Sequence, residues 1–442
     1  MTVASASGCH SIARLSTCGS VAYTAIVLLF FPESLIPMLS ISAAFDCLLA
    51  TVTPLDHVSL SLSECLGLTL AADVAASADS PPFDKALMDG YAVRSADVVS
   101  GTALLAVVDL ITAGNVPTKS VGQGEAIQIM TGAPLPTGAD VVVKIEETER
   151  EGAQVRLATR STTPGANILR RGTSVRAGSV VLQSGLKLNG SRIGALAELG
   201  QSLVSVYPRP TVAILATGDE LVAIDEEPGP GQIRNSNQSM LTAQILAAGA
   251  VPIPLGVARD NRPELRAKIE QGLACDVLVL SGGVSAGMLD LVPSELAAAG
   301  VTEVFHKVEM KPGKPIWFGQ RQAAGADRPR RTYVFGLPGN PVSSLVCCEL
   351  FVRTAIRRLM GEPLALPQSI PARLEHCYNA KADRPTYHPA CLTWSEAGPV
   401  VTLVPWHGSS DLCGTVAANG VVYLSGEPRQ YEVGAIVETY PW

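Results

Sequence analysis

Short apolar runs alternate with helical patterns in the second half of the chain. Each run is continuously apolar, which is typical of a strand buried on both faces of a sheet. The strands are expected at 212–216, 251–257, 277–280 and 332–335, and the helices at 236–248, 262–274, 294–299 and 342–360. This alternation predicts a doubly wound parallel sheet, whose right-handed crossovers bring the strand ends together along one edge.

Glycines and polar side chains follow three of these strands. Ligands of open α/β sheets bind beyond the carboxyl ends of the strands, and glycine-rich turns let backbone N–H groups approach an anion. The candidates directly after the strands are Gly218, Asp219 and Glu220; Ser281, Gly282, Gly283, Ser285 and Asp290; and Pro338, Gly339, Asn340, Pro341 and Ser343. Asp260, Lys311 and Lys314 lie on neighbouring loops.

These residue types indicate metal-assisted chemistry on a phosphoanhydride. Carboxylates such as Glu220, Asp260 and Asp290 hold hard cations like Mg²⁺, while lysines and helix N-termini neutralise phosphate and a second oxyanion. The sequence contains neither GxxxxGK[ST] nor GxGxxG, which disfavours an ordinary ATPase or dehydrogenase. Two structural alternatives remain, because Thr217 and Glu220 fit a helix capping box and Asp290 fits a helix N-cap.

The rest of the chain predicts further units. An amphipathic helix is expected just after Met38, and residues 101–160 have the pattern of short strands separated by Gly and Pro. From residue 362 onward, alternating strands predict a small β-barrel or sandwich, in which the scattered histidines are structural or surface residues.

Two single residues and one arginine-containing segment outside the parallel-sheet region are further candidates. Asp89 precedes Gly90 in a turn motif, and Thr131 lies in a loop rich in Gly and Pro, so each is either a site residue or an ordinary turn residue. The arginines of segment 167–172 either clamp an anion or form a solvated face.

Composition narrows these possibilities. The chain has 442 residues, is 47% hydrophobic and 17% charged, and carries a formal net charge of −7. This length suits about three or four domains, and the negative charge argues against nucleic acid as the main partner. The ten cysteines show no zinc-type spacing, so buried thiols in a reducing cytoplasm are expected.

The first 37 residues differ from the remainder. Their apolar run, Val21–Phe31, is too short to span a bilayer, and no membrane partner is expected. We interpret residues 1–37 as an extension outside the fold, with a signal peptide as the alternative.

Seven motifs between Met38 and Trp442 together resemble the molybdopterin molybdenumtransferases, the MoeA type that is shared with the E domain of gephyrin. The motifs are PPFDKALMDGYAV, IMTGAPLPTGADVVV, ATGDEL, GQIRNSN, SGGVSAGMLD, MKPGKP and GLPGNPVSS. The resemblance implies insertion of molybdate into adenylated molybdopterin, with release of AMP, a requirement for Mg²⁺ and formation of molybdenum cofactor. It also implies an elongated homodimer, with a molybdopterin adenylyltransferase and molybdoenzyme acceptors as further partners.

The resemblance also implies an α/β multidomain organisation. Residues 38–75 and 172–206 would form an elongated α/β dimerisation domain, and residues 76–171 a β-rich inserted domain. Residues 207–361 would form the molybdopterin-binding, MogA-like parallel-sheet domain, followed by a C-terminal β-barrel at 362–442.

Carried over by position, the family's functional residues fall on the candidates already described. The catalytic candidates are Asp89, Thr131, Glu220, Asp260 and Asp290, of which the last three are also candidate Mg²⁺ ligands. Lys311, Lys314, Ser285 and Ser343 are candidate oxyanion ligands, and Pro338 and Pro341 match the family's turn prolines.

At two places the sequence departs from the family pattern, which affects the assignment of family residue roles to this chain. Ala86-Leu87 stands where the family has Ser-Ala, which would remove a hydroxyl from the cleft. Leu169 replaces an arginine and Thr173-Ser174 an acidic pair, which would alter the local balance of metal and anion binding.

Two other functions compete with this one. The first is a molybdopterin adenylyltransferase built on the same parallel-sheet domain, although a compact enzyme of that kind does not need residues 38–200 and 362–442. The second is a gephyrin-like scaffold that binds a partner peptide. The retained carboxylates Asp89, Glu220 and Asp260, together with Asp290, argue against a purely structural role.

Overall fold

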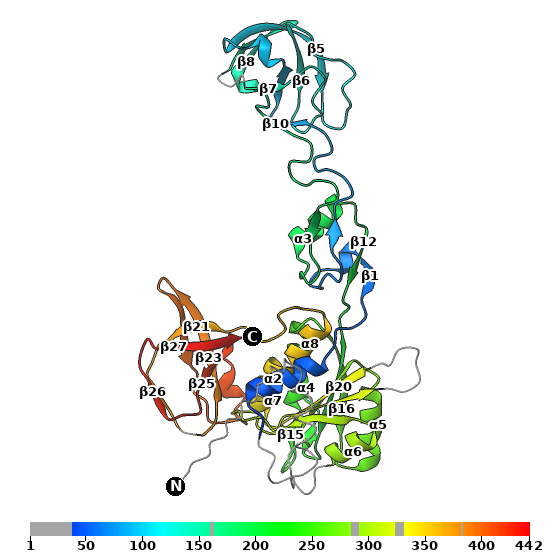
Figure 1. The fold of residues 1–442 in the computed structure, drawn as a ribbon. Helices are drawn as coiled ribbons and strands as arrows, with labels where there is room; N and C mark the ends of the chain where they lie inside the picture. The colour runs from blue at the N-terminus through cyan, green and yellow to red at the C-terminus, as the bar shows by residue number, and fades with distance from the viewer. Residues whose placement is uncertain (1–37, 160–162, 284–290, 323–330, 382) are drawn as a thin grey trace, which may run out of the picture.

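The computed structural model describes residues 38–159, 163–283, 291–322, 331–381 and 383–442. The predictions for residues 1–37, Ser285 and Asp290 lie outside these ranges. Figure 1 shows an elongated chain, with a β-rich unit at one end and an α/β unit at the other. A narrow segment that contains α3 (Gly190–Glu198) joins the two ends, and a small β-unit lies beside the α/β unit.

The α/β unit is built on a six-stranded sheet with the order β16-β13-β17-β20-β19-β18. Its first four strands are parallel, as the continuous apolar runs predicted. They are β16 (Val251–Ala258), β13 (Thr211–Thr217), β17 (Val277–Ser281) and β20 (Arg331–Leu337). The carboxyl ends of β13, β17 and β20 therefore meet at one edge.

The other two strands, β19 (Trp317–Gln322) and β18 (Thr302–His306), pair antiparallel and make the sheet mixed. The sequence analysis expected no strand at 317–322. Only the first two residues of that segment are large and apolar, and Gly319 and Gln320 follow directly, so its apolar run is too short to predict a strand. The segment that joins β18 to β19 carries Lys311 and Lys314.

Helices cover both faces of the sheet. Alternate residues of β13 and β17 enter two separate cores, because successive strand side chains point to opposite faces. One core contains Leu265 and Ile269 of α5 (Arg262–Gly272) and Leu296 of α6 (Val292–Ala298). On the opposite face, the other core contains residues of α4 (Ser236–Ala247) and of the last helical segment of the α/β unit, residues 341–359.

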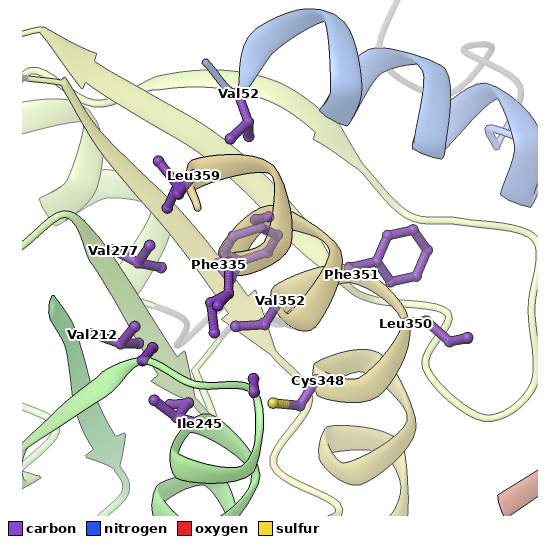
Figure 2. Close-up of a cluster of buried hydrophobic side chains, with 14 of the residues drawn as sticks. Val52, Val212, Ile245, Val277, Phe335, Cys348, Leu350, Phe351, Val352 and Leu359 are labelled. Atoms are coloured by element: carbon purple, nitrogen blue, oxygen red, sulfur yellow. The ribbon is translucent and has the colours of Figure 1, made fainter. Parts of the chain in front are cut away.

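This segment, residues 341–359, confirms the predicted long helix, but a π-helical turn interrupts it. It runs through α7 (Pro341–Cys347), a π-helical turn at Cys348–Val352 and α8 (Arg353–Leu359). Figure 2 shows Cys348 and Val352 of the π-helical turn close to Ile245 of α4 and Val277 of the sheet. Both residues are almost completely buried, so the turn is part of the core.

The first described helix, α2 (Ile41–Thr51), packs beside α8 (Figure 1). Ser40 caps it by accepting a hydrogen bond from the N–H of Ala43. Ala44 and Leu48 are fully buried, which confirms the amphipathic helix that the sequence predicted. The helix therefore belongs to the same core as the parallel sheet.

Two pairs of short strands make up the connecting segment together with α3. They are β1 (Val58–Ser61) with β12 (Leu203–Val206), and β2 (Val74–Ala75) with β11 (Val180–Leu182). At the entrance to the β-rich unit, Arg170 pairs with Asp84 at 2.6 Å and Arg171 with Asp79 at 2.6 Å. Both arginines are exposed and bind carboxylates of the fold itself, which agrees with the solvated-face alternative and leaves them occupied by ion pairs.

The β-rich unit is a six-stranded sheet with the order β7-β4-β6-β5-β9-β8. Its strands are β4 (Gly90–Val93), β5 (Thr102–Ile111), β6 (Glu125–Ile129), β7 (Val141–Lys144), β8 (Thr148–Glu151) and β9 (Gln154–Ala158). A two-stranded pair of β3 (Lys85–Ala86) and β10 (Ile168–Leu169) lies at its base. The strand-rich pattern predicted for residues 101–160 is therefore confirmed.

The C-terminal unit is a closed barrel, which decides between the two predicted alternatives. Its strands are β21 (Ile370–Leu374), β24 (Gly398–Leu403), β23 (Thr386–Ser395), β25 (Gly420–Leu424) and β27 (Ile436–Pro441). The pair β22 (Tyr378–Ala380) and β26 (Arg429–Tyr431) extends from it.

The remaining short elements lie in connections. They are β14 (Leu221–Val222), β15 (Ile233–Arg234) and the 3₁₀ turns Leu62–Glu64, Ser95–Asp97, Ile145–Glu147 and Cys413–Thr415. None of the helices in the described part of the chain has the length and apolarity needed to cross a membrane.

Candidate active site

The carboxyl ends of β13, β17 and β20 border a cavity of about 940 Å³, which we call the acidic cavity. It is lined by ten of the residues that the sequence analysis selected. They are Gly218, Glu220, Asp260, Ser281, Gly282, Gly283, Pro338, Gly339, Asn340 and Pro341. The lining also includes Asp411 and Cys413 of the barrel, so two units of the fold enclose this cavity.

Glu220 is not part of a helix cap. No helix follows it, because Leu221 begins β14 and the carbonyl of Glu220 accepts the N–H of Ile233 at 2.8 Å. Its carboxylate folds back over Gly218, where a Cβ atom would lie only 2.4 Å from Oε2 of Glu220. The capping-box alternative is therefore wrong, and glycine at 218 leaves room for the carboxylate beside the cavity.

Glycine is also needed where β17 ends. Gly282 has a φ of +97°, and a Cβ atom there would lie 2.7 Å from the carbonyl oxygen of Thr217 at the end of β13. A larger residue would push the two strand ends apart, because backbone on both sides leaves no room for adjustment. Gly282 therefore sets the close spacing of the loops at this edge.

Asp219 lies beside Asp260, one of the two acidic residues, with Glu220, that the sequence analysis selected and that line the acidic cavity. The N–H of Asp260 donates to Oδ1 of Asp219 at 3.1 Å. Burial, followed by the negative charges of Asp219 and Glu220, raises the pKa of Asp260 above its ordinary value. A bound cation would relieve this repulsion.

The carboxylate oxygens of this site are the type of ligand that Mg²⁺ prefers. They are too few to surround the ion, so a bound substrate would have to supply further ligands. Among the residues that the structure describes, no three His, Cys, Asp or Glu side chains are arranged to hold a metal ion. Mg²⁺ in phosphate-processing sites is usually held by one or two carboxylates together with phosphate oxygens. Glu220 and Asp260 fit that role, whereas Asp290 lies outside the described residues.

The raised pKa of Asp260 leads to a pH-dependent expectation. Protons compete with a cation for Asp260 until the pH exceeds this raised pKa. Asp219→Asn keeps the acceptor oxygen but removes one of the charges responsible, so the pKa of Asp260 should fall. We expect the acid limb of Mg²⁺ binding, measured by calorimetry across pH, to move to lower pH in this variant. An unchanged acid limb would show that the charge of Asp219 does not control Asp260.

Asn237 is a site residue that the sequence analysis did not select. Its Nδ2 donates to Oγ of Ser281 at 2.7 Å and to the carbonyl of Gly339 at 2.8 Å. It thereby ties the loop after β17 to the loop after β20, and it lines the acidic cavity. The GQIRNSN motif contains this residue, and its place in the first turn of α4 was the available signal.

The Pro-Gly-Asn-Pro turn is held by the barrel. Pro341 has no N–H, and the N–H of Val342 donates to the carbonyl of Ser409 at 2.9 Å. The side-chain amide of Asn340 also donates to Oγ of Ser409 at 3.1 Å. We predicted that the N-terminus of α7 binds an anion through its free N–H groups. The first of these, the N–H of Val342, is already bonded to the barrel, so the prediction is wrong for that group.

A second cavity, of about 570 Å³, lies between the Lys311–Lys314 loop and the barrel, and we call it the basic cavity. Its charged lining comprises Lys311, Lys314, Lys381 and Arg384, with Asp383 as the carboxylate. Ser343 is buried and also lines it. This cavity therefore carries an excess of positive charge and suits an oxyanion.

The barrel positions the first lysine of that loop. The N–H of Lys311 donates to the carbonyl of Pro385 at 2.8 Å, and its own carbonyl accepts the N–H of Tyr387 at 2.7 Å. Arg384 directly precedes Pro385. The sequence analysis selected neither Arg384 nor Lys381 as a site residue. The KADRP segment shows basic residues, but only docking of the barrel brings them to the loop.

The barrel histidines have the structural roles that the sequence predicted. His388 is buried between Tyr378 and Trp406, and burial lowers its pKa. His407 is exposed and bonds Asp411 at 3.0 Å. His388 also contributes to the lining of the basic cavity, which its sequence position did not reveal.

The two cavities adjoin each other. Pro315, Pro338 and Asn340 line both of them. A group bound beside the Lys311–Lys314 loop would therefore lie next to a molecule bound across the strand ends.

Asp89 and Thr131 contact each other in the β-rich unit. Oδ1 of Asp89 accepts the N–H of Thr131 at 2.6 Å and its hydroxyl at 2.7 Å. These hydrogen bonds hold the pKa of Asp89 below its ordinary value, so it is ionised at neutral pH. Asp89 thus organises a turn, as the simpler alternative predicted, and it remains exposed to solvent.

The β-rich sheet that carries this pair lies at the opposite end of the subunit from β15 and α5, which flank the acidic cavity (Figure 1). Within one chain, the predicted site residues in the described part of the structure therefore fall into two separate groups. The first comprises Asp89 and Thr131, and the second surrounds the two cavities.

The departures from the family motifs lie near the first group. Ala86 is buried and pairs with Ile168 between β3 and β10, whereas Leu87 is exposed. The hydroxyl of Thr173 donates to the carbonyl of Arg170 at 2.7 Å. None of these residues lines either cavity, so the departures leave both cavities unchanged.

Comparison with protein families covers nearly the whole of the described chain. Residues 39–200 match the MoeA N-terminal region (domain I and II), and residues 371–442 match the MoeA C-terminal region (domain IV). Between them, residues 213–358 match a probable molybdopterin binding domain. The last match contains the strand ends that form the acidic cavity.

Two similar proteins carry the same name, molybdopterin molybdenumtransferase. A molybdopterin molybdenumtransferase of Staphylococcus epidermidis is 33% identical over 405 residues, which are 90% of this chain and 94% of that protein. A protein with the same name from Nostoc is 40% identical over 300 residues, which are 67% of each chain.

Solved structures of MoeA proteins are similar as well. A molybdopterin biosynthesis MoeA protein of Pyrococcus horikoshii aligns with a TM-score of 0.77 and 28% identity, over 92% of this chain and 100% of that one. Another solved structure of a molybdopterin biosynthesis MoeA protein from Pyrococcus horikoshii aligns with a TM-score of 0.75 and 30% identity, over 92% of this chain and 99% of that one.

Proposed function

The chain belongs to the MoeA family of molybdopterin molybdenumtransferases, and from this premise we propose that it inserts molybdate into adenylated molybdopterin with release of AMP. It is an enzyme of molybdenum cofactor biosynthesis. The matches to the MoeA N- and C-terminal regions favour this activity over a compact adenylyltransferase.

The observation that supports the proposed reaction is the pairing of two adjoining cavities of opposite charge. The acidic cavity offers Glu220 and Asp260, and the basic cavity offers Lys311 and Lys314. A cation and a phosphoanhydride suit the first cavity, while a tetrahedral oxyanion suits the second. Their common wall would place the oxyanion beside the pterin-bearing substrate.

We assign the residues to roles on this basis. Glu220 and Asp260 would hold Mg²⁺, which when bound would neutralise charge on the phosphate oxygens. Gly282 and Gly283 would let the phosphate approach the backbone at the end of β17. Asn237 would keep the two flanking loops together, and Lys311 and Lys314 would bind molybdate.

The proposal extends to assembly and location. We propose a homodimer in which Asp89 and Thr131 of one subunit complete the site of the other, because a single subunit keeps the two groups apart (Figure 1). We also propose that the enzyme acts in the cytoplasm. A molybdopterin adenylyltransferase would supply its substrate, and molybdoenzymes would accept its product.

The test is an assay of AMP release from adenylated molybdopterin. We expect AMP in the presence of Mg²⁺ and molybdate, and much less when either is omitted. AMP release that is independent of molybdate would contradict the proposal. Formation of pyrophosphate from ATP and molybdopterin would instead identify an adenylyltransferase.

A further inference from the structure

Two ion pairs join residues that line the basic cavity, and Asp383 is the carboxylate in both. Asp383 accepts from Nε of Arg384 at 3.0 Å and from Nη2 of Arg384 at 3.2 Å, using one carboxylate oxygen for each. Its Oδ2 also lies 3.6 Å from Nζ of Lys311. A single carboxylate thus engages two of the cations that line the cavity.

The other cations of the cavity are available. Lys314 and Lys381 have no ion-pair partner among the residues that the structure describes. The cavity would therefore attract an anion to one part of its lining, while Asp383 already occupies the other. The side chain of Asp383 is 43% exposed, so it has room to swing into solvent without disturbing the core.

The contact with Arg384 has the geometry of an anion-binding pair. Two N–H groups of a guanidinium facing two oxygens is the arrangement in which arginine binds carboxylates and tetrahedral oxyanions alike. Hydrogen bonding from Arg384, assisted by the charges of Arg384 and Lys311, lowers the pKa of Asp383. The carboxylate is therefore ionised at neutral pH and competes for the groups that an oxyanion would use.

We propose that Asp383 is an internal anion that occupies Arg384 and Lys311 while the cavity is empty and is displaced when an oxyanion binds. This inference rests on the proposed binding of molybdate in the basic cavity. Asp383 then sets the affinity of the cavity for every anion, because each must first replace it. Weakly bound monoanions such as chloride gain less from the same cations than a dianion does, so they are kept out at ordinary concentrations.

The alternative role of Asp383 is to hold Arg384 in the orientation that an oxyanion requires. The two roles predict opposite effects of removing the charge. Loss of a competitor tightens oxyanion binding, whereas loss of a positioning group weakens it.

The test is calorimetric titration of the full chain with molybdate, and then with molybdate at increasing chloride. We expect Asp383→Asn to bind molybdate about threefold to tenfold more tightly than wild type. This factor corresponds to the small free energy that an exposed carboxylate gains from pairing with two cations, which molybdate would no longer have to overcome. We also expect chloride to compete more strongly in this variant. Glu396→Gln is the matched control, because it removes an exposed carboxylate from the same barrel away from either cavity.

Each outcome is decisive. Weaker binding in Asp383→Asn would identify a positioning residue, and unchanged binding would show that the ion pair has no effect on the cavity. Lys311→Ala separates this inference from the proposed function. If wild type and Lys311→Ala bind molybdate equally well, the oxyanion is not held in this cavity, and the proposed placement fails whatever Asp383 does.

Discussion

Asp260→Asn is expected to lower AMP release at least about a hundredfold, a scale typical of losing one electrostatic group from an active site. Asparagine has nearly the same shape but cannot carry the negative charge that the proposed Mg²⁺ would require. Stability should not fall, because burial and the charges of Asp219 and Glu220 already disfavour the ionised form. Replacing it with a neutral group removes that repulsion.

The measurement is AMP release per folded molecule, with urea unfolding in parallel. Asp225→Asn serves as a control, since it removes an exposed carboxylate from the neighbouring loop without entering either cavity. A destabilised Asp260→Asn with normal activity per folded molecule would show that Asp260 has a structural role only.

Mixed dimers should recover activity that neither parent variant has. Asp89→Ala and Asp260→Ala are each expected to be inactive, because every site in such a dimer contains the lesion. In a mixed dimer with shared sites, one site would collect both lesions and the other would be intact. Equal amounts that pair at random give half mixed dimers, so activity should return to about a quarter of wild type.

The structure makes this experiment discriminating. Asp89 directly precedes β4 of the β-rich sheet, which lies at the far end of the chain from the acidic cavity (Figure 1), so it cannot contribute to that cavity within its own chain. Failure to recover activity, with mixed dimers shown by mass spectrometry, would contradict the shared site. The role of Asp260 would be unaffected by that result.

The sequence predicted the elements whose signals are local. Continuous apolar runs identified the four parallel strands, and the same pattern placed Glu220, Ser281 and Pro338 at their carboxyl ends. The capping box at Thr217 and Glu220 remained open from the sequence alone, and β14 directly after Glu220 excludes it. The close contact of Asp89 with Thr131 brings together two motifs that were selected separately.

What the sequence did not predict depends on contacts between units. Arg384 and Lys381 reach the basic cavity only because the barrel docks beside the Lys311–Lys314 loop. The bond from Val342 to Ser409 arises in the same way, and it removes an N–H that a helix end would otherwise offer. Strand β19 was missed because its pairing with β18 and β20, rather than its short apolar run, stabilises it.

The division of the site into an acidic and a basic cavity is tested most directly by locating the oxyanion in a crystal. Tungstate has the charge and shape of molybdate, and tungsten scatters X-rays anomalously. We expect its anomalous peak in the basic cavity, within contact of Lys311 and Lys314. A peak among Glu220 and Asp260 instead, with the basic cavity empty, would contradict the account.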